Sequence, residues 1–274
     1  VSTYEKIVRG NKNISDKERA IPYGYSDLGF LYAGNSDSQE SLASHVVTGK
    51  IPEQDTIAVV QALLPFTKTF LDVNKSTGLY GWVAAHYYEK NQIENAHVTI
   101  YEPNQKNMEA LSETRFLNNW EDRITLTAKI PPNTPRTDFV TIKTSDYTEE
   151  IKTVVEDALT NQSLLLIEPH KETNFLFDKH KKNYWFFVCD NRKIRELLDG
   201  KPLHMTKTLL LLPKESTLII PALYKAMETY RKEHFVLFGL LEKTTFINYL
   251  HTIIPPYITP KKVLTYIFRR LRIS

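Results

Sequence analysis

The 274-residue sequence has a single cysteine, Cys189, so no disulfide can form within the chain. This excludes a disulfide-stabilised scaffold, and we expect a reducing, cytoplasmic location. The sequence also lacks an apolar run of the roughly 18 residues that a membrane-spanning helix needs. Its first twenty residues are polar and charged, so we expect no secretory signal peptide there.

An excess of charge of one sign is missing too. The 35 Lys and Arg residues nearly cancel the 32 Asp and Glu residues, which leaves a net charge of +3. A nucleic-acid-binding surface usually needs a concentrated basic face, so we expect no nucleic acid among the partners. No His or Cys spacing resembles a structural zinc site, and we expect no metal. The absence of a Gly-x-Ser-x-Gly elbow argues against an α/β-hydrolase.

The sequence does contain short apolar runs that alternate with helical patterns. This alternation predicts an α/β fold with a doubly wound, mostly parallel, seven-stranded sheet. The run at 163–169 is almost wholly apolar, which is typical of a strand buried on both faces. The last two expected strands are interpreted as a closing antiparallel pair. The expected strands are 69–73, 97–103, 124–129, 138–143, 163–169, 184–190 and 207–214, and the expected helices are 53–64, 79–91, 104–120 and 149–159.

The same pattern sets the expected domain limits. Residues 1–52 are interpreted as an irregular N-terminal arm with one helix near Gln39–Val47, residues 53–216 as the α/β domain, and residues 217–274 as a helical extension broken at Pro221. In 261–274 the apolar residues fall on one helical face with basic residues around them. This pattern predicts a peripheral contact with an anionic membrane or a protein partner, the alternative being packing on the chain's own core.

Two adjacent strand ends predict a ligand site. In open parallel sheets, ligands bind beyond the carboxyl ends of the strands, where the strand order reverses. After the first strand, the loop at 74–78 leads into a helix whose free N–H groups can receive a polar ligand. Glu102 closes the next strand, and its carboxylate can accept both hydroxyl protons of a ribose. Loop and acid together predict nucleoside binding, the alternative for Glu102 being a solvated strand-end carboxylate.

Several segments resemble the FkbM family of methyltransferases. They are FLDVNKSTGLYGWVAA, VTIYEPNQKNMEALSETRFLNN, DFVTIKTSDYTEEI, LLLIEPH and LLLLPKE, in that order. The Glu-Pro-Asn step, followed by a helix ending in Leu-Asn-Asn, is the most specific part. The resemblance implies a class I methyltransferase fold, S-adenosylmethionine as the cofactor, and methylation of hydroxyl groups, often on sugars.

The resemblance also assigns residues to the cofactor. They are Asp72, Asn74, Ser76, Thr77 and Gly78 beside the methionine part, Glu102 at the ribose and Asn104 near the adenine.

The sequence departs from the family pattern at two strand ends. The family's first loop usually reads Asp-Val-Gly-Ala-Asn-x-Gly, whereas Asn74, Lys75 and Ser76 stand here between Val73 and Gly78. The family's fourth strand usually ends in Ile-Asp-Val-Glu-Gly. Here Lys143 stands in place of the aspartate, so the charge at that point is reversed.

Three residues are candidates for catalysis. Glu168 matches the family's acidic end of the fifth strand, and His170 lies on the same side of an extended segment because it is two residues away. Asp146 is a candidate for a displaced carboxylate. The alternative for Glu168 and His170 is a strand-end carboxylate and a surface histidine.

Two hypotheses of function follow. The first is an S-adenosylmethionine-dependent O-methyltransferase that acts on a sugar or glycan hydroxyl. The second is a catalytically inactive methyltransferase-like domain that serves as a binding or docking module in glycan assembly, where it holds an oligosaccharide or a protein partner.

Overall fold

The computed structural model describes residues 23–26, 28–33, 53–74, 78–130, 136–144, 147–170, 178–190, 193–196, 208–226 and 228–229. The chain divides into two compact units, Val1–Met227 and Glu228–Ser274. The fold described below is that of the first unit. The expected helix near Gln39–Val47 and the basic segment 261–274 lie outside the described residues.

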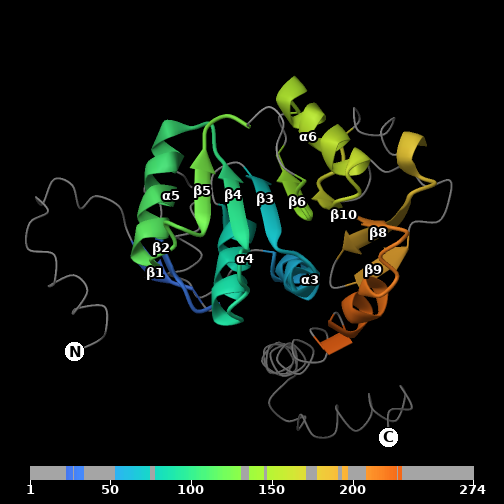
Figure 1. Cartoon of the computed structure of the whole chain (residues 1–274), viewed down its shortest axis with the longest axis horizontal. Helices are drawn as coiled ribbons and strands as arrows, with labels where there is room; N and C mark the ends of the chain where they lie inside the picture. The colour runs from blue at the N-terminus through green and yellow to red at the C-terminus, as the bar shows by residue number, and fades with distance from the viewer. Residues whose placement is uncertain are drawn as a thin grey trace, which may run out of the picture. The chain divides into compact units, whose positions relative to one another are not determined.

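Among the described residues, the first unit is built on one eight-stranded sheet with the order β5-β4-β3-β6-β7-β10-β8-β9 (Figure 1). The five strands from β5 to β7 run parallel, and β10, β8 and β9 each pair antiparallel with the preceding neighbour. The strands are β3 (Thr69–Asn74), β4 (His97–Tyr101), β5 (Ile124–Thr127), β6 (Phe139–Lys143), β7 (Leu164–Ile167), β8 (Tyr184–Asp190), β9 (Lys193–Glu196) and β10 (Thr208–Pro213).

The predicted α/β fold with a mostly parallel, doubly wound sheet is confirmed. All seven expected strands are present, and β8 and β10 form the expected antiparallel pair. All four residues of β7 are buried, as its apolar run predicts. The eighth strand, β9, was not predicted, because Ile194 is its only apolar residue and four residues give too short a period-2 pattern.

Helices cover both faces of the sheet. The helix α6 (Glu149–Thr160) buries its apolar face against Leu71, Val73, Val140 and Ile142 of the sheet. On the opposite face, α4 (Leu79–Lys90) lies so close that a Cβ at Gly81 would come within 2.6 Å of Ile100 Cγ1. Figure 1 shows α6 on one side of the sheet and α4 with α5 (Gln105–Leu117) on the other. The helix α3 (Gln54–Leu63) packs beside α4.

Two prolines test the predicted helix ends. As expected, α3 ends at Leu63, and Pro65 lies in the short 3-10 helix η1 (Leu64–Phe66) that follows. The predicted break at Pro221 is wrong, because 219–226 is helical. Pro221 lies in the first turn of this helix, where a missing N–H breaks no intrahelical hydrogen bond.

Part of the segment predicted as an irregular arm forms a β-hairpin, β1 (Tyr23–Tyr25) and β2 (Leu31–Ala33). Its docking explains the Leu-Asn-Asn sequence at the end of α5. The Asn118 amide donates to Leu31 O (2.7 Å) and accepts from Leu31 N (2.9 Å). Thr114 Oγ1 accepts from Ala33 N (2.9 Å), while Asn119 has the left-handed φ of 57° that ends the helix. The hairpin was not predicted because three-residue strands carry almost no periodicity.

Asn118→Ala should therefore lower the free energy of unfolding by about 1–3 kcal/mol, because Leu31 loses both of its partners at this side chain. Urea denaturation measures the change. Phe116→Ala, at an exposed position of the same helix, is the matched control and should change the free energy by less than about 0.5 kcal/mol. Equal stabilities of the Asn118 and Phe116 variants would contradict this role of Asn118.

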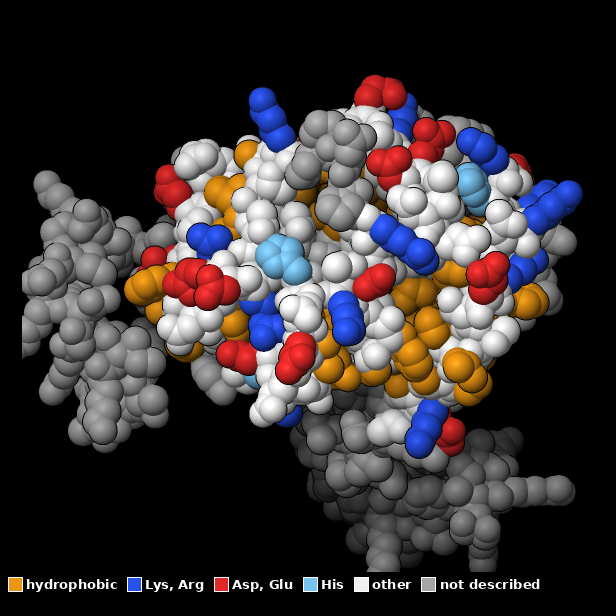
Figure 2. Space-filling model, in the orientation of Figure 1, with side chains coloured by type: hydrophobic (Ala, Val, Ile, Leu, Met, Phe, Trp, Pro, Cys, Tyr) orange, Lys and Arg blue, Asp and Glu red, His pale blue; other side chains and the backbone are white. Residues whose placement is uncertain are grey.

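The surface agrees with the nearly neutral composition. On the face that Figure 2 shows, the described basic and acidic side chains are interspersed. Within the described ranges, no helix has the length and apolar character needed to cross a membrane.

Candidate functional site

The carboxyl end of β3 is the point where the strand order reverses, because β4 lies on one side of it and β6 on the other. Ligands of open α/β sheets bind at such a point. A cavity of about 170 Å³ lies there. It is lined by Val73, Tyr101, Pro103, Thr144, Thr148 and Ile151.

Glu102 directly follows β4 and stands in the sequence between two residues that line this cavity, Tyr101 and Pro103. The residue is only 1% exposed. Its Oε1 accepts from Asn104 N (2.8 Å), and its Oε2 accepts from Asn107 Nδ2 (3.2 Å). These two bonds fix the orientation of the carboxylate at the end of β4.

Asp72 belongs to the interior of the fold. Its Oδ2 accepts from Gly81 N (2.8 Å) and its Oδ1 from Thr141 Oγ1 (2.8 Å). Complete burial raises the pKa of Asp72 to about 6, and the hydrogen bonds from Gly81, Thr141 and Tyr80 limit the rise. This carboxylate therefore braces the first turn of α4. The resemblance assigned Asp72 to the cofactor, whereas its described bonds go to α4 and to Thr141 of β6.

Gly78 precedes α4 and has a φ of 57°, a left-handed conformation that glycine adopts without strain. The three nearest atoms to a Cβ at this position belong to Leu111, Trp82 and Ile100, at 3.1–3.3 Å. Gly78 thus allows α4 to start close against α5 and β4. The other assigned loop residues are described less fully: Asn74 ends β3, with its side chain outside the described part, and Ser76 and Thr77 lie wholly outside it.

At the end of β6, Lys143 stands where the family pattern has a carboxylate, and it forms an ion pair. Lys143 Nζ forms an ion pair with Glu53, and the other carboxylate oxygen of Glu53 accepts from Tyr80 OH. Burial lowers the pKa of Lys143, and the field of Glu168 opposes that change. The contact with Glu53 likewise favours the charged form, so we treat Lys143 as a cation. Sequence reasoning missed Glu53, because an acid at the start of a helix is usually only a cap.

Glu53 itself has a left-handed backbone, with φ 60° and ψ 38°. Such a conformation is uncommon for a residue with a Cβ and persists only where its surroundings hold it. The bonds to Lys143 and Tyr80 supply that restraint, so they fix the start of α3 against β6 and α4.

Two of the three candidate catalytic residues, Glu168 and His170, follow the end of β7. Glu168 is exposed just beyond β7, its backbone N–H donates to Ile142 O (2.9 Å), and its carboxylate acts on Lys143. His170 stacks on Tyr147, with ring centroids 5.4 Å apart and planes at 7°. Asp146 lies outside the described residues. The structure thus places Glu168 beside Lys143 and His170 beside Tyr147.

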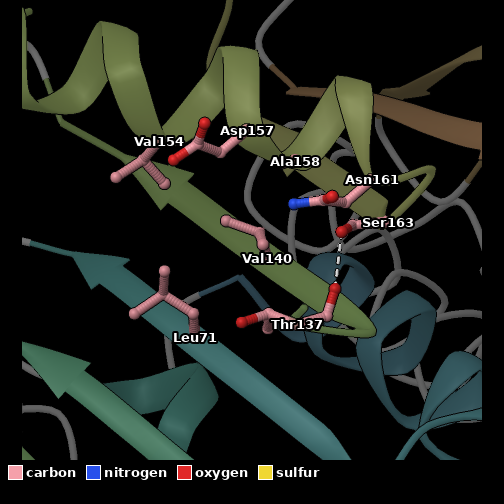
Figure 3. A pocket seen from close by; sticks show the side chains of 8 residues that line it. All are labelled: Leu71, Thr137, Val140, Val154, Asp157, Ala158, Asn161 and Ser163. Carbon is pink, nitrogen blue, oxygen red and sulfur yellow. Dashed lines mark hydrogen bonds between the residues drawn. The ribbon is translucent and has the colours of Figure 1, made fainter. Parts of the chain in front are cut away.

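A second cavity, shown in Figure 3, lies at the opposite ends of the strands. Thr137 precedes β6 and Ser163 precedes β7, and Ser163 Oγ donates to Thr137 O (2.5 Å). This second cavity has a volume of about 20 Å³, which is room for about one water, so it is not a candidate site for a cofactor.

The remaining chemically notable residues are packed. His86 lies against Phe30 and Trp120, with ring centroids 5.9 and 6.4 Å apart, and Cys189 is buried. Within the ranges that the structure describes, no three His, Cys, Asp or Glu side chains gather as metal ligands would.

The strand order defines the class of fold. Five strands run parallel, and β3, the first of them along the chain, lies at the switch point. The antiparallel strand β10 is inserted between β7 and β8. This order is that of the mixed sheet of class I methyltransferases. This is the fold that the resemblance implied, here with β9 as an added edge strand.

Comparisons with known proteins give similarity at the level of the whole fold. No family model and no curated protein matches the chain. Among solved structures, a methyltransferase from Geobacter sulfurreducens is 15% identical, with a TM-score of 0.43 over 62% of this chain and 84% of that one. The METTL16 methyltransferase domain is 13% identical, with a TM-score of 0.41 over 77% and 92%.

A SAM-dependent O-methyltransferase from Thermotoga maritima is 9% identical, with a TM-score of 0.39. The match covers 58% of this chain and 64% of the Thermotoga chain. At such identities and TM-scores, the assignment of the fold rests on the strand order rather than on these similarities.

Proposed function

We propose that this chain binds S-adenosylmethionine and transfers its methyl group to a hydroxyl group of a substrate. The observation that carries the proposal is the buried carboxylate of Glu102, which directly follows β4 next to the switch point of the sheet. A carboxylate at this place in a βαβ unit accepts hydrogen bonds from ribose hydroxyls.

The described residues fit the nucleoside part of such a cofactor. Glu102 would hold the ribose, and the apolar walls formed by Val73, Tyr101, Pro103 and Ile151 would enclose the base. Pockets for whole ligands usually measure about 300–1,000 Å³, so a cavity of about 170 Å³ suits the base rather than the complete cofactor. The start of α4, at Gly78, would face the methionine part.

When bound, S-adenosylmethionine supplies an electrophilic methyl group. The chain's own residues then have to orient the acceptor hydroxyl and remove its proton. Glu168, His170 and Asp146 are the candidates for this role, and Glu168 is exposed to an incoming substrate. Lys143 would act as a fixed cation that stabilises negative charge on the acceptor oxygen, because its pairing with Glu53 disfavours the neutral amine that a base requires.

The resemblance to FkbM proteins extends the proposal to a hydroxyl group on a sugar or glycan. Segment 261–274 is proposed to contact a membrane surface or a protein partner on the strength of its basic amphipathic pattern alone.

A second candidate function is a methyltransferase-like domain without catalysis that serves as a binding or docking module in glycan assembly. The observation in its favour is the Lys143–Glu53–Tyr80 cluster at the end of β6. These side chains bond to one another at the strand end where the family pattern has a carboxylate.

Calorimetric titration of the whole chain separates the two functions. We expect both S-adenosylmethionine and S-adenosylhomocysteine to bind with micromolar dissociation constants, because each contains the adenosine for which the Glu102 site is proposed. If neither ligand gives a binding heat at millimolar concentration, the methyltransferase function fails and the docking function is favoured.

A further inference from the structure

The cavity of about 170 Å³ at the carboxyl end of β3 is called the strand-end cavity below. One of its walls is Tyr101, a residue that is 8% exposed. The Tyr101 hydroxyl donates to Glu150 Oε2 (3.1 Å), in the first turn of α6. The position of this wall therefore depends on a residue that does not itself line the cavity.

The second oxygen of the same carboxylate accepts from Ile130 N (2.8 Å), beyond the end of β5. Glu150 thus joins three elements around the cavity: the end of β4, the segment after β5 and the start of α6. A negative charge in the first turn also suits the positive end of the helix macrodipole. The start of α6 has a cap of its own, since Thr148 Oγ1 accepts from Ile151 N (3.4 Å), so the helix does not need Glu150 to begin.

We propose that Glu150 is a positioning residue that holds the Tyr101 ring as a wall of the strand-end cavity and thereby sets the affinity for the nucleoside part of the ligand. This inference rests on the proposed function for the identity of the ligand, and on the two bonds of Glu150 for its mechanism. Without the carboxylate, the Tyr101 hydroxyl and the Ile130 N–H lose these bonds. The phenol side chain is then free to turn toward the cavity.

The neighbouring acid gives a matched control. Glu149 lies in the same turn with the same charge, its side chain is 88% exposed, and it pairs with Lys152 of its own helix. Glu149→Ala therefore repeats the change in charge and in helix dipole without touching Tyr101. Glu150→Gln is the conservative variant, because its amide oxygen can accept from Ile130 N while its NH₂ donates to the Tyr101 oxygen.

The first measurement is the affinity of each variant for S-adenosylhomocysteine and for adenosine alone. Glu150→Ala should weaken both by about tenfold or more, which corresponds to about 1.4 kcal/mol. Glu149→Ala should stay within about twofold of the wild type, and Glu150→Gln should recover most of the loss. A merely structural role would instead lower the unfolding temperature of Glu150→Ala and leave both affinities unchanged.

The second measurement needs no ligand. Hydrogen exchange at the Ile130 amide should become faster in Glu150→Ala and stay unchanged in Glu149→Ala. Wild-type binding that Glu150→Ala leaves unaltered, or an equal loss in Glu149→Ala, overturns the role of Glu150 alone. Failure of the wild type to bind either ligand overturns the proposed function, and the role of Glu150 in ligand affinity with it.

Discussion

Replacing Asp72 by alanine should lower the free energy of unfolding by about 2–4 kcal/mol at neutral pH. The side chain is fully buried and accepts hydrogen bonds from Gly81 N and Thr141 Oγ1. Alanine leaves these donors without an acceptor in the interior and also leaves a small void. Relief from burying a negative charge offsets only part of that loss.

The isosteric variant Asp72→Asn should show how the buried charge depends on pH. The pKa of Asp72 is raised from 3.8 to about 6 in the folded protein. Between these two pH values the folded state keeps a proton that the unfolded chain releases. The contribution of Asp72 to the free energy of unfolding therefore falls as the pH rises from 3.8 to about 6. The contribution lost is about 3 kcal/mol, and asparagine lacks this titration altogether.

Urea denaturation of the three proteins between pH 4 and pH 7.5, at constant ionic strength, measures both effects. Asp72→Asn should gain stability relative to the wild type as pH rises, because only the wild type pays for ionising the buried carboxyl. Its amide oxygen can still accept from Gly81 N while the NH₂ donates to Thr141 Oγ1. Parallel pH profiles of stability for the wild type and Asp72→Asn would show that the pKa of the Asp72 carboxyl is not raised.

The strands of the sheet could be predicted from the sequence because their burial leaves a direct pattern. Continuous apolar runs mark β7 and β10, and helical spacing of apolar residues marks α6 between β6 and β7. The β1–β2 hairpin could not be predicted in this way. It is held by polar side chains of α5 that are 81 and 87 residues away in sequence, and hydrophobic patterning carries no information about such bonds.

The sequence could predict a residue of the candidate site only where the position of that residue depends on no partner elsewhere in the chain. Glu102 directly follows a strand beside the switch point, so its position follows from the expected topology. The partners of Lys143 and Tyr101 did not follow, because Glu53 and Glu150 come from the starts of two helices and meet their partners only in the folded chain. The bonds of Asp72 to Gly81 and Thr141 were missed for the same reason, since an acid near a strand end looks alike in sequence whether it faces a ligand or the protein interior.

Replacing Glu102 by glutamine should weaken the binding of S-adenosylhomocysteine by about 10- to 100-fold, as expected for the loss of hydrogen bonds to a charged group. The carboxylate is held by Asn104 N and Asn107 Nδ2. Glutamine keeps the shape and one acceptor oxygen, but its NH₂ cannot accept from a second ribose hydroxyl. Stability should change little, because the Asn107 amide can turn its oxygen toward the new donor.

Deoxygenated ligands locate this effect at the ribose. The wild type should bind adenosine more tightly than 2′-deoxyadenosine or 3′-deoxyadenosine. Glu102→Gln should discriminate less between these ligands, because the ribose hydroxyl and the Glu102 carboxylate are the two partners of the same proposed hydrogen bonds. Glu149→Gln, which alters an exposed acid on α6, should keep the discrimination of the wild type. If Glu102→Gln loses affinity but keeps the full preference for adenosine, Glu102 acts by holding the start of α5 through Asn104 rather than by binding the ribose.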